Sequence, residues 1–148
     1  NGALTLGTMD GANVEIAELA GAKNIYTFGK DSESIIKLYE TAGYVSKDYY
    51  KKDKHIKRAV DFILDSTLVK LGNQKRLKRL HDELLNKDWF MTLIDFDAYV
   101  KAKEQILADY EDQDSWNKKV IHNIAKAGFF SSDRTIAQYN TDIWHCED

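Results

Sequence analysis

The sequence opens with a short strand that runs directly into a helix. Residues 4–6 (Leu-Thr-Leu) are apolar and partly β-branched, Gly7 and Gly11 bracket a turn, and helical spacing of apolar residues begins at Val14. In open α/β sheets, ligands bind at the carboxyl ends of strands and at helix N-termini, where free N–H groups attract anions. The turn over residues 8–13 is therefore where we expect the chemistry of this chain to lie.

A second strand and helix follow at once. Residues 24–28 form the strand, which Gly29 closes, and either Asp31 or Ser32 then caps a helix that ends at Gly43. A helical crossover brings the second strand alongside the first in parallel. Sheets usually contain several strands, so we expect the rest of this sheet to come from sequence that precedes Asn1. Residues 1–43 are thus predicted to be a βαβα unit.

The remainder, residues 44–148, is predicted to be helical because the chain contains no proline, the commonest helix breaker. Helices are expected to begin at Asp95, Ser115 and Ser132, and two more stripes of apolar residues lie on either side of Gly72-Asn73. The residues predicted to face a core are Ile35, Leu38, Tyr39, Ala42, Ile56, Ala59, Val60, Ile63, Leu64, Leu77, Leu80, Leu84, Leu85, Phe96, Tyr99, Val100, Lys103, Leu107, Tyr110, Trp116, Val120, Ile124, Ile136, Tyr139 and Ile143. The predicted fold class is a predominantly helical α/β fold with two short parallel strands and about seven helices.

Composition narrows the possible partners and compartment. A net charge of -3 gives no global electrostatic reason to expect a nucleic acid or an acidic membrane as partner. Cys146 is the only cysteine, so no disulfide can form within the chain, which favours a reducing compartment. No signal segment opens the chain and no run of eighteen apolar residues occurs, so the expected location is the cytoplasm.

No cluster of residues indicates a metal site or a nucleophile. The four histidines lack a His or Cys partner at helical ligand spacing, and His145 and Cys146 are adjacent and point differently on a helix. The basic run over residues 75–80 is interrupted by leucines and is predicted to be the exposed face of a packed helix. Carboxylates are too numerous for one pair to stand out. We therefore assign no catalytic, cofactor-binding or metal-binding residue.

Asp10 allows two interpretations. It could line a ligand pocket with Thr8 and Gly11 at the end of the first strand, orienting a phosphate or a sugar hydroxyl. Alternatively, Asp10 caps the following helix and Gly11 only supplies a permissive turn. Capping is the favoured interpretation, because Asp so often takes that role.

Two blocks of the sequence resemble one family. Residues 1–16, with Thr-Met-Asp-Gly-Ala-Asn-Val-Glu at 8–15, and residues 130–139, with Ile143-Trp144 after them, are similar to the C-terminal catalytic region of the α-glucan phosphorylases. Between the blocks the resemblance is looser, at residues 24–29, 43–44, 49–50 and 97–101. The resemblance therefore spans the whole chain and is sharp at its two ends.

The resemblance implies a two-domain glycosyltransferase fold with the active site between two Rossmann-like domains. Residues 1–148 would be an incomplete C-terminal Rossmann-like domain. Such enzymes use inorganic phosphate to release glucose 1-phosphate from the end of an α-1,4-glucan, with pyridoxal phosphate as cofactor. The cofactor's phosphate exchanges protons with the substrate phosphate, which suits a group whose second pKa is about 6.

The family's cofactor lysine lies in a Gly-rich segment that would precede Asn1, and no lysine here matches it; Lys23, the nearest, lies in a different loop. The chain alone is therefore expected neither to hold the cofactor nor to catalyse phosphorolysis. A non-catalytic helical interaction module that carries the motif is the alternative. Since an incomplete sheet leaves an unpaired edge or an apolar face, self-association is a further hypothesis.

Overall fold

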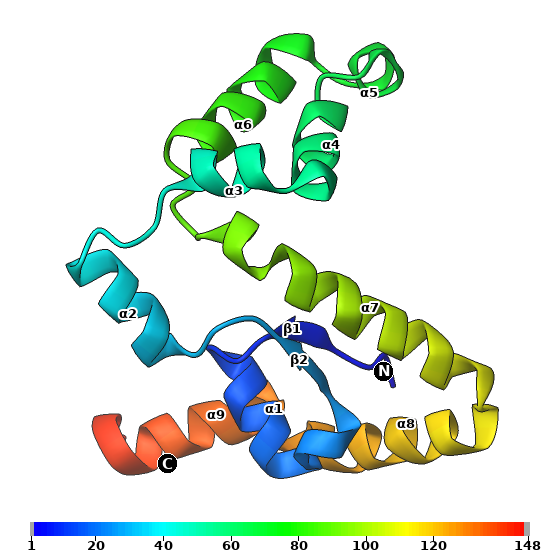
Figure 1. Ribbon diagram of the computed structural model, residues 1–148. Coiled ribbons are helices and arrows are strands. Elements are labelled where there is room, and N and C mark those ends of the chain that lie inside the picture. The colour runs from blue at the N-terminus through cyan, green and yellow to red at the C-terminus, as the bar shows by residue number, and fades with distance from the viewer. Residues whose placement is uncertain (1, 147–148) are drawn as a thin grey trace. The chain divides into compact units, whose positions relative to one another are not determined.

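The computed structural model describes residues 2–146 and is shown in Figure 1. The elements follow one another as β1 (Leu6–Thr8), α1 (Ala12–Ala20), a 3-10 turn (Ala22–Asn24), β2 (Tyr26–Phe28), α2 (Ser32–Glu40), α3 (Ser46–Lys52), α4 (Lys54–Phe62), α5 (Ser66–Leu71), α6 (Gln74–Asn86), a 3-10 turn (Thr92–Asp95), α7 (Phe96–Glu111), α8 (Gln113–Ala127), a 3-10 turn (Gly128–Phe130), α9 (Ser132–Tyr139) and a π-helical turn (Asn140–Trp144). Within the described residues, seven of the α-helices have eight residues or more. The prediction of a predominantly helical α/β fold is confirmed.

The βαβα unit forms as predicted. Strands β1 and β2 pair in parallel in a two-stranded sheet, and α1 makes the crossover between them. The Tyr26 backbone N–H donates to the Thr5 carbonyl over 2.9 Å at the start of the pairing. β1 covers residues 6–8 rather than the predicted 4–6, so the strand reaches the turn itself.

Helix starts follow capping chemistry, with two corrections. Asp31 caps α2, since its carboxylate accepts from the Ser34 N–H over 2.8 Å. Asp112, not Ser115, caps α8: the Asp112 carboxylate accepts both the backbone N–H of Ser115, over 3.1 Å, and its hydroxyl, over 2.7 Å. Ser131 caps α9 one residue before the predicted Ser132.

Helix α2 ends in a Schellman motif that does not place glycine at the left-handed position. The Gly43 N–H donates to the Leu38 carbonyl and the Ala42 N–H to the Tyr39 carbonyl. The left-handed residue is Ala42, at φ 50°, and Gly43 follows it. At Gly43 a Cβ would lie 3.1 Å from a methyl of Leu38, so close packing, rather than φ, favours glycine there.

The chain divides into two compact units. Unit 1 comprises residues 1–7, 11–26 and 105–148, and unit 2 comprises residues 8–10 and 27–104. Each has its own small core. The interpretation of residues 1–148 as one incomplete domain divided at residue 43 stays a prediction.

In unit 1, Tyr26 joins β2 to the C-terminal helices. Tyr26 is buried, its ring stacks on Trp116 at 6.3 Å between centroids, and its hydroxyl donates to Asp109 over 2.7 Å. Asn123 of α8 donates to the Asn24 carbonyl over 2.8 Å. These polar contacts satisfy groups that burial would otherwise leave without water, and they fix α8 against the crossover.

In unit 2, the core forms around Ile56, Val60 and Leu93, which are all buried. Tyr49, Tyr50, Leu85 and Phe96 pack around these three residues. The core therefore gathers side chains from α3, α4, α6 and the start of α7. Helices α3 and α5, which the sequence analysis did not identify, are only seven and six residues long.

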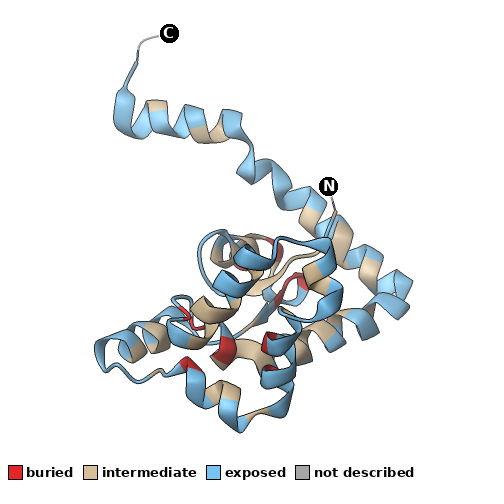
Figure 2. Ribbon diagram, turned by 90° about the horizontal axis from the view of Figure 1, so that it is seen from above, coloured by how far each residue is buried: buried red, intermediate tan, exposed pale blue. Residues whose placement is uncertain are grey.

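Many residues predicted to face a core are exposed. Figure 2 shows that few residues are buried and that large parts of the helices are exposed. The predicted core residues that are exposed are Tyr39, Ala42, Ala59, Leu64, Leu80, Tyr99, Leu107, Tyr110, Ile124, Ile136, Tyr139 and Ile143. Those core predictions are wrong for this chain, because an amphipathic stripe specifies an apolar face but not the surface that covers it. Among the described residues no helix is long and apolar enough to cross a membrane.

Candidate functional site

The turn between β1 and α1 is the segment that sequence analysis identified as the place for chemistry. The Asp10 N–H donates to the Thr8 carbonyl over 2.9 Å, which turns the chain tightly after the strand. Gly11 then occupies the N-cap position of α1 with φ 48°, a conformation that glycine adopts readily. The helix begins at Ala12, directly beyond the strand end, as in the ligand-binding turns of α/β proteins.

Asp10 does not cap α1, so the favoured capping interpretation is wrong. The N-cap residue is Gly11, and the Asp10 carboxylate instead accepts the hydroxyl of Thr8 over 3.0 Å. The tight turn directs the side chain back toward the strand end rather than along the helix axis. Asp10 is exposed, which leaves a carboxylate and a hydroxyl paired at the surface of the turn.

Gly7 allows Asn13 to lie against the strand end. A Cβ at position 7 would lie 2.5 Å from the side-chain nitrogen of Asn13, closer than real Cβ contacts. Close approach of the Asn13 side chain, and not the φ of Gly7, therefore favours glycine at this position. From sequence, Gly7 was predicted only to bracket the turn, and no role was predicted for Asn13.

The first and last sequence blocks meet in unit 1. Glu15 of α1 lines an open groove of about 490 Å³ together with residues of the last block, among them Phe130, Arg134, Gln138 and Tyr139. The two blocks are more than a hundred residues apart in the sequence, so this convergence could not be derived from their spacing. The groove brings together the two parts of the chain that carry the family resemblance.

Arg134 organises the last block. Its guanidinium lies 3.8 Å from the centroid of the Phe129 ring, its Nε donates to the Phe129 carbonyl, and one Nη donates to Gln138 over 2.6 Å. Arg134 therefore fixes the start of α9 to the turn before it. No role was predicted for Arg134 from sequence, although it lies inside the second block that carries the family resemblance.

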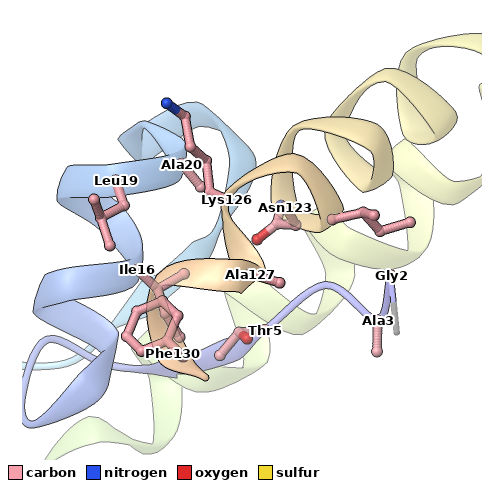
Figure 3. Close-up of a pocket in the computed structure, with 11 residues that line it drawn as sticks. Gly2, Ala3, Thr5, Ile16, Leu19, Ala20, Asn123, Lys126, Ala127 and Phe130 are labelled. Carbon is pink, nitrogen blue, oxygen red and sulfur yellow. The ribbon is translucent and has the colours of Figure 1, made fainter. Parts of the chain in front are cut away.

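A smaller pocket also lies in unit 1. Figure 3 shows Thr5 before β1, Ile16 and Ala20 of α1, and Asn123 and Phe130 lining it, and its volume is about 130 Å³. Ligand pockets usually measure about 300–1,000 Å³, so this pocket is too small for a sugar or a nucleotide. Its lining is largely apolar, which makes it an incompletely filled part of the packing between α1 and α8.

Other residues considered from sequence belong to other elements than the turn. Lys23 is in the 3-10 turn before β2, where its carbonyl accepts the Lys119 ammonium over 2.5 Å. The basic run lies on α6, with Lys75, Lys78 and Arg79 exposed, as predicted for a helix face. Among residues 2–146 no group of three or more His, Cys, Asp or Glu side chains could hold a metal ion.

Fold and turn together define a predominantly helical α/β protein with a glycine-containing βα turn of the ligand-binding type. The chain belongs to the carbohydrate phosphorylase family, whose model matches residues 1–146. It is 65% identical over 98% of its length to a maltodextrin phosphorylase of Streptococcus pneumoniae. It is also 42% identical over 97% of its length to a glycogen phosphorylase of Bacillus subtilis and 45% identical over 99% to the brain form of glycogen phosphorylase from Ovis aries.

The chain spans less than a fifth of these relatives: 19% of the streptococcal protein, 18% of the Bacillus protein and 17% of the sheep protein. The matched region is therefore a fragment of the relatives' length, and it includes both blocks that meet in unit 1.

Proposed function

We propose that this chain is the C-terminal part of an α-glucan phosphorylase. The complete polypeptide would use inorganic phosphate to release glucose 1-phosphate from the non-reducing end of an α-1,4-glucan, with pyridoxal phosphate as cofactor. The observation that carries the proposal is the family match over residues 1–146, together with high identity to a protein named maltodextrin phosphorylase.

The turn over residues 8–13 would form one wall of the phosphate-handling cleft. It follows a parallel strand and precedes α1, at whose N-cap position glycine supplies no side-chain hydrogen bond. The N-terminus of a helix attracts anions. At the same turn the Thr8 hydroxyl could donate a hydrogen bond to phosphate, and the Asp10 carboxylate could accept one from a sugar hydroxyl.

The described residues do not by themselves fit pyridoxal phosphate. The small pocket of unit 1 is about 130 Å³, and Lys126, which lines it, comes from α8 and not from a glycine-rich loop beside the turn. The groove that Glu15 and α9 share is open and contains no lysine. We therefore propose that the remainder of the phosphorylase supplies the cofactor site, and that this chain supports it through the βα unit and the helices behind it.

The same proposal covers location and partners. A phosphorylase of this kind would work in the cytoplasm, on α-1,4-glucan and phosphate, without nucleic acid or membrane as partner. Isolated residues 1–148 would associate with one another through the apolar helix faces that the rest of the polypeptide would otherwise cover.

Two purified proteins test the proposal: the complete polypeptide that carries this chain, and residues 1–148 alone. Each is incubated with maltoheptaose and phosphate, and glucose 1-phosphate is measured together with the absorbance of bound pyridoxal. We expect both signals from the complete polypeptide and neither from residues 1–148.

Either signal from residues 1–148 alone would refute the proposal that the remainder of the polypeptide supplies the cofactor site and is needed for activity. A complete polypeptide that gives no glucose 1-phosphate, although it is folded, would refute the proposed activity and favour the helical interaction module.

A further inference from the structure

The connection between α6 and α7 is a tight turn that exposes two aromatic side chains. The Met91 N–H donates to the Asp88 carbonyl over 2.8 Å and closes the turn. Asp88 and Met91, at its ends, are 5% and 3% exposed, whereas Trp89 and Phe90 between them are 62% and 89% exposed. The turn thus has buried ends and an aromatic tip.

Buried hydrogen bonds hold the turn in place. The Asp88 carboxylate accepts the Tyr44 hydroxyl over 2.5 Å and the Leu93 N–H over 2.9 Å, and the Asp88 N–H donates to Glu83 over 2.8 Å. Asp88 and Met91 both have positive φ, 39° and 51°, a conformation that side chains other than glycine adopt at a cost. The tip is therefore presented by a fixed scaffold and is not a loose loop.

Turn chemistry does not explain the residues at the tip. The central positions of turns favour Gly, Asn, Asp, Pro and Ser, each for a backbone reason that Trp and Phe do not share. Exposing two aromatic rings also forgoes the stabilisation that burial of their apolar surface would give. Neither local folding nor core packing therefore accounts for Trp89 and Phe90.

A third aromatic residue reaches the same turn. Tyr39 of α2 donates its hydroxyl to the Trp89 carbonyl, and its side chain is also exposed. We call Tyr39, Trp89 and Phe90 the aromatic platform. All three belong to unit 2.

The aromatic platform continues into a polar groove on α6. Lys87 lines this groove, and its ammonium lies 5.4 Å from the centroid of the Trp89 ring. The groove measures about 360 Å³, and its charges are mixed: Lys78 pairs with Asp82 at 2.5 Å, and Lys87 lies 3.9 Å from Glu83. It therefore offers both hydrogen-bond donors and hydrogen-bond acceptors beside the Trp89 ring.

We propose that the aromatic platform and this groove bind an α-1,4-glucan chain, an inference that rests on the proposed function. A glucose ring has C–H groups on its faces, which pack on aromatic rings, and hydroxyls at its edge, which need donors and acceptors of both kinds. A nucleic acid would favour a uniformly basic surface, whereas two carboxylates, each paired with a lysine, lie among the four basic side chains of this groove.

The test uses the complete phosphorylase polypeptide with Trp89→Ala and Phe90→Ala combined. We expect the KM for maltoheptaose to rise at least fivefold, with the KM for phosphate unchanged, because the platform contacts only the glucan. The pair Trp89→Tyr and Phe90→Tyr keeps aromatic rings and should restore the KM to within about twofold. Leu71→Ala, at a side chain 84% exposed in the same unit, is the matched control and should change neither constant.

A second measurement is independent of catalysis. In native electrophoresis through a gel that contains glycogen, the wild-type polypeptide should be retarded and the double alanine variant should migrate faster. If the wild type releases no glucose 1-phosphate but shows this difference, the proposed function fails and the aromatic platform stands. Equal retardation and equal KM for both proteins would overturn the proposal, and a loss of subunit or domain assembly with unchanged glucan binding would replace it with a protein interface.

Discussion

Tyr26→Phe removes one hydroxyl from the centre of unit 1 and leaves the ring in place. The hydroxyl donates to Asp109 over 2.7 Å, and Tyr26 is only 8% exposed. Hydrogen bonds to charged groups contribute about 1.5–3 kcal/mol to stability. The Asp109 side chain is 28% exposed and, in the variant, still accepts a hydrogen bond from the Gln105 amide over 2.6 Å. We therefore expect the loss of stability to lie at the lower end of that range, about 1.5 kcal/mol.

Urea denaturation of residues 1–148, followed by far-UV circular dichroism, measures this loss. With an m-value of about 2 kcal/mol/M, the midpoint should fall by about 0.7 M. Combining Tyr26→Phe with Asp109→Asn isolates the pair, and the coupling energy should be about 1 kcal/mol. Tyr110→Phe is the matched control, since Tyr110 also packs on Trp116 but is half exposed, and its midpoint should not move.

The pH dependence follows from two opposite pKa shifts. Burial, and then the hydrogen bond to Asp109, raise the pKa of Tyr26. The stability that the protonated Tyr26 hydroxyl contributes is therefore fully present below about pH 10 and is lost as the pH rises further. The bond from Tyr26 lowers the pKa of Asp109, so the stability it contributes is present above about pH 4 and is lost as the pH falls through the folded value. The difference in the free energy of unfolding between wild type and Tyr26→Phe should therefore become smaller at both high and low pH. A gap that is below 0.5 kcal/mol at pH 7, or that widens in acid, would refute this account.

Two further predictions concern a backbone position and the exposed helix faces. Gly29→Ala should lower the stability of residues 1–148 by about 1–3 kcal/mol, because Gly29 has φ 85° and a Cβ would lie 2.6 Å from the Asp95 carboxylate. Gly128→Ala is the control: the space around Gly128 is open, so this substitution should cost less than about 1 kcal/mol in the same urea denaturation assay. Equal losses of stability in the two variants would contradict the reasoning. Residues 1–148 should sediment as concentration-dependent oligomers, and a single 17.0 kDa species at all concentrations would contradict the proposal that the apolar helix faces associate.

The sequence predicted local structure well where one residue type had one physical role. The βα unit, β2 and the Asp31 cap all formed, because strand composition, glycine turns and capping side chains act within a few residues. Where two good caps lie within one turn, residue type cannot rank them. Ser115 donates to Asp112 rather than capping the helix itself, and Ser131 precedes Ser132 by one position.

The site was predictable only in part. The position of the turn followed from the strand–helix order, but the role of Asp10 did not, since the path of the chain through the turn directs its carboxylate to Thr8. The meeting of Glu15 with Arg134 and the last helix depends on tertiary packing across more than a hundred residues. No periodicity carries that information.

Two groups of exposed apolar side chains need different explanations. One group is the residues that were wrongly predicted to face a core, and the other is the aromatic turn with Trp89 and Phe90. On the helices, Leu107, Ile124 and Ile136 lie on regular apolar stripes, and the chain spans under a fifth of the length of its relatives, so we propose that the rest of the polypeptide covers these residues. Trp89 and Phe90 lie on no stripe and are fixed outward by a buried carboxylate and two strained backbone positions. An apolar stripe needs only packing, whereas backbone strain clusters at binding sites, and the strain at Asp88 and Met91 therefore supports the binding proposal for the turn between them. For this reason we assign the stripes to assembly of the polypeptide and the aromatic turn to binding.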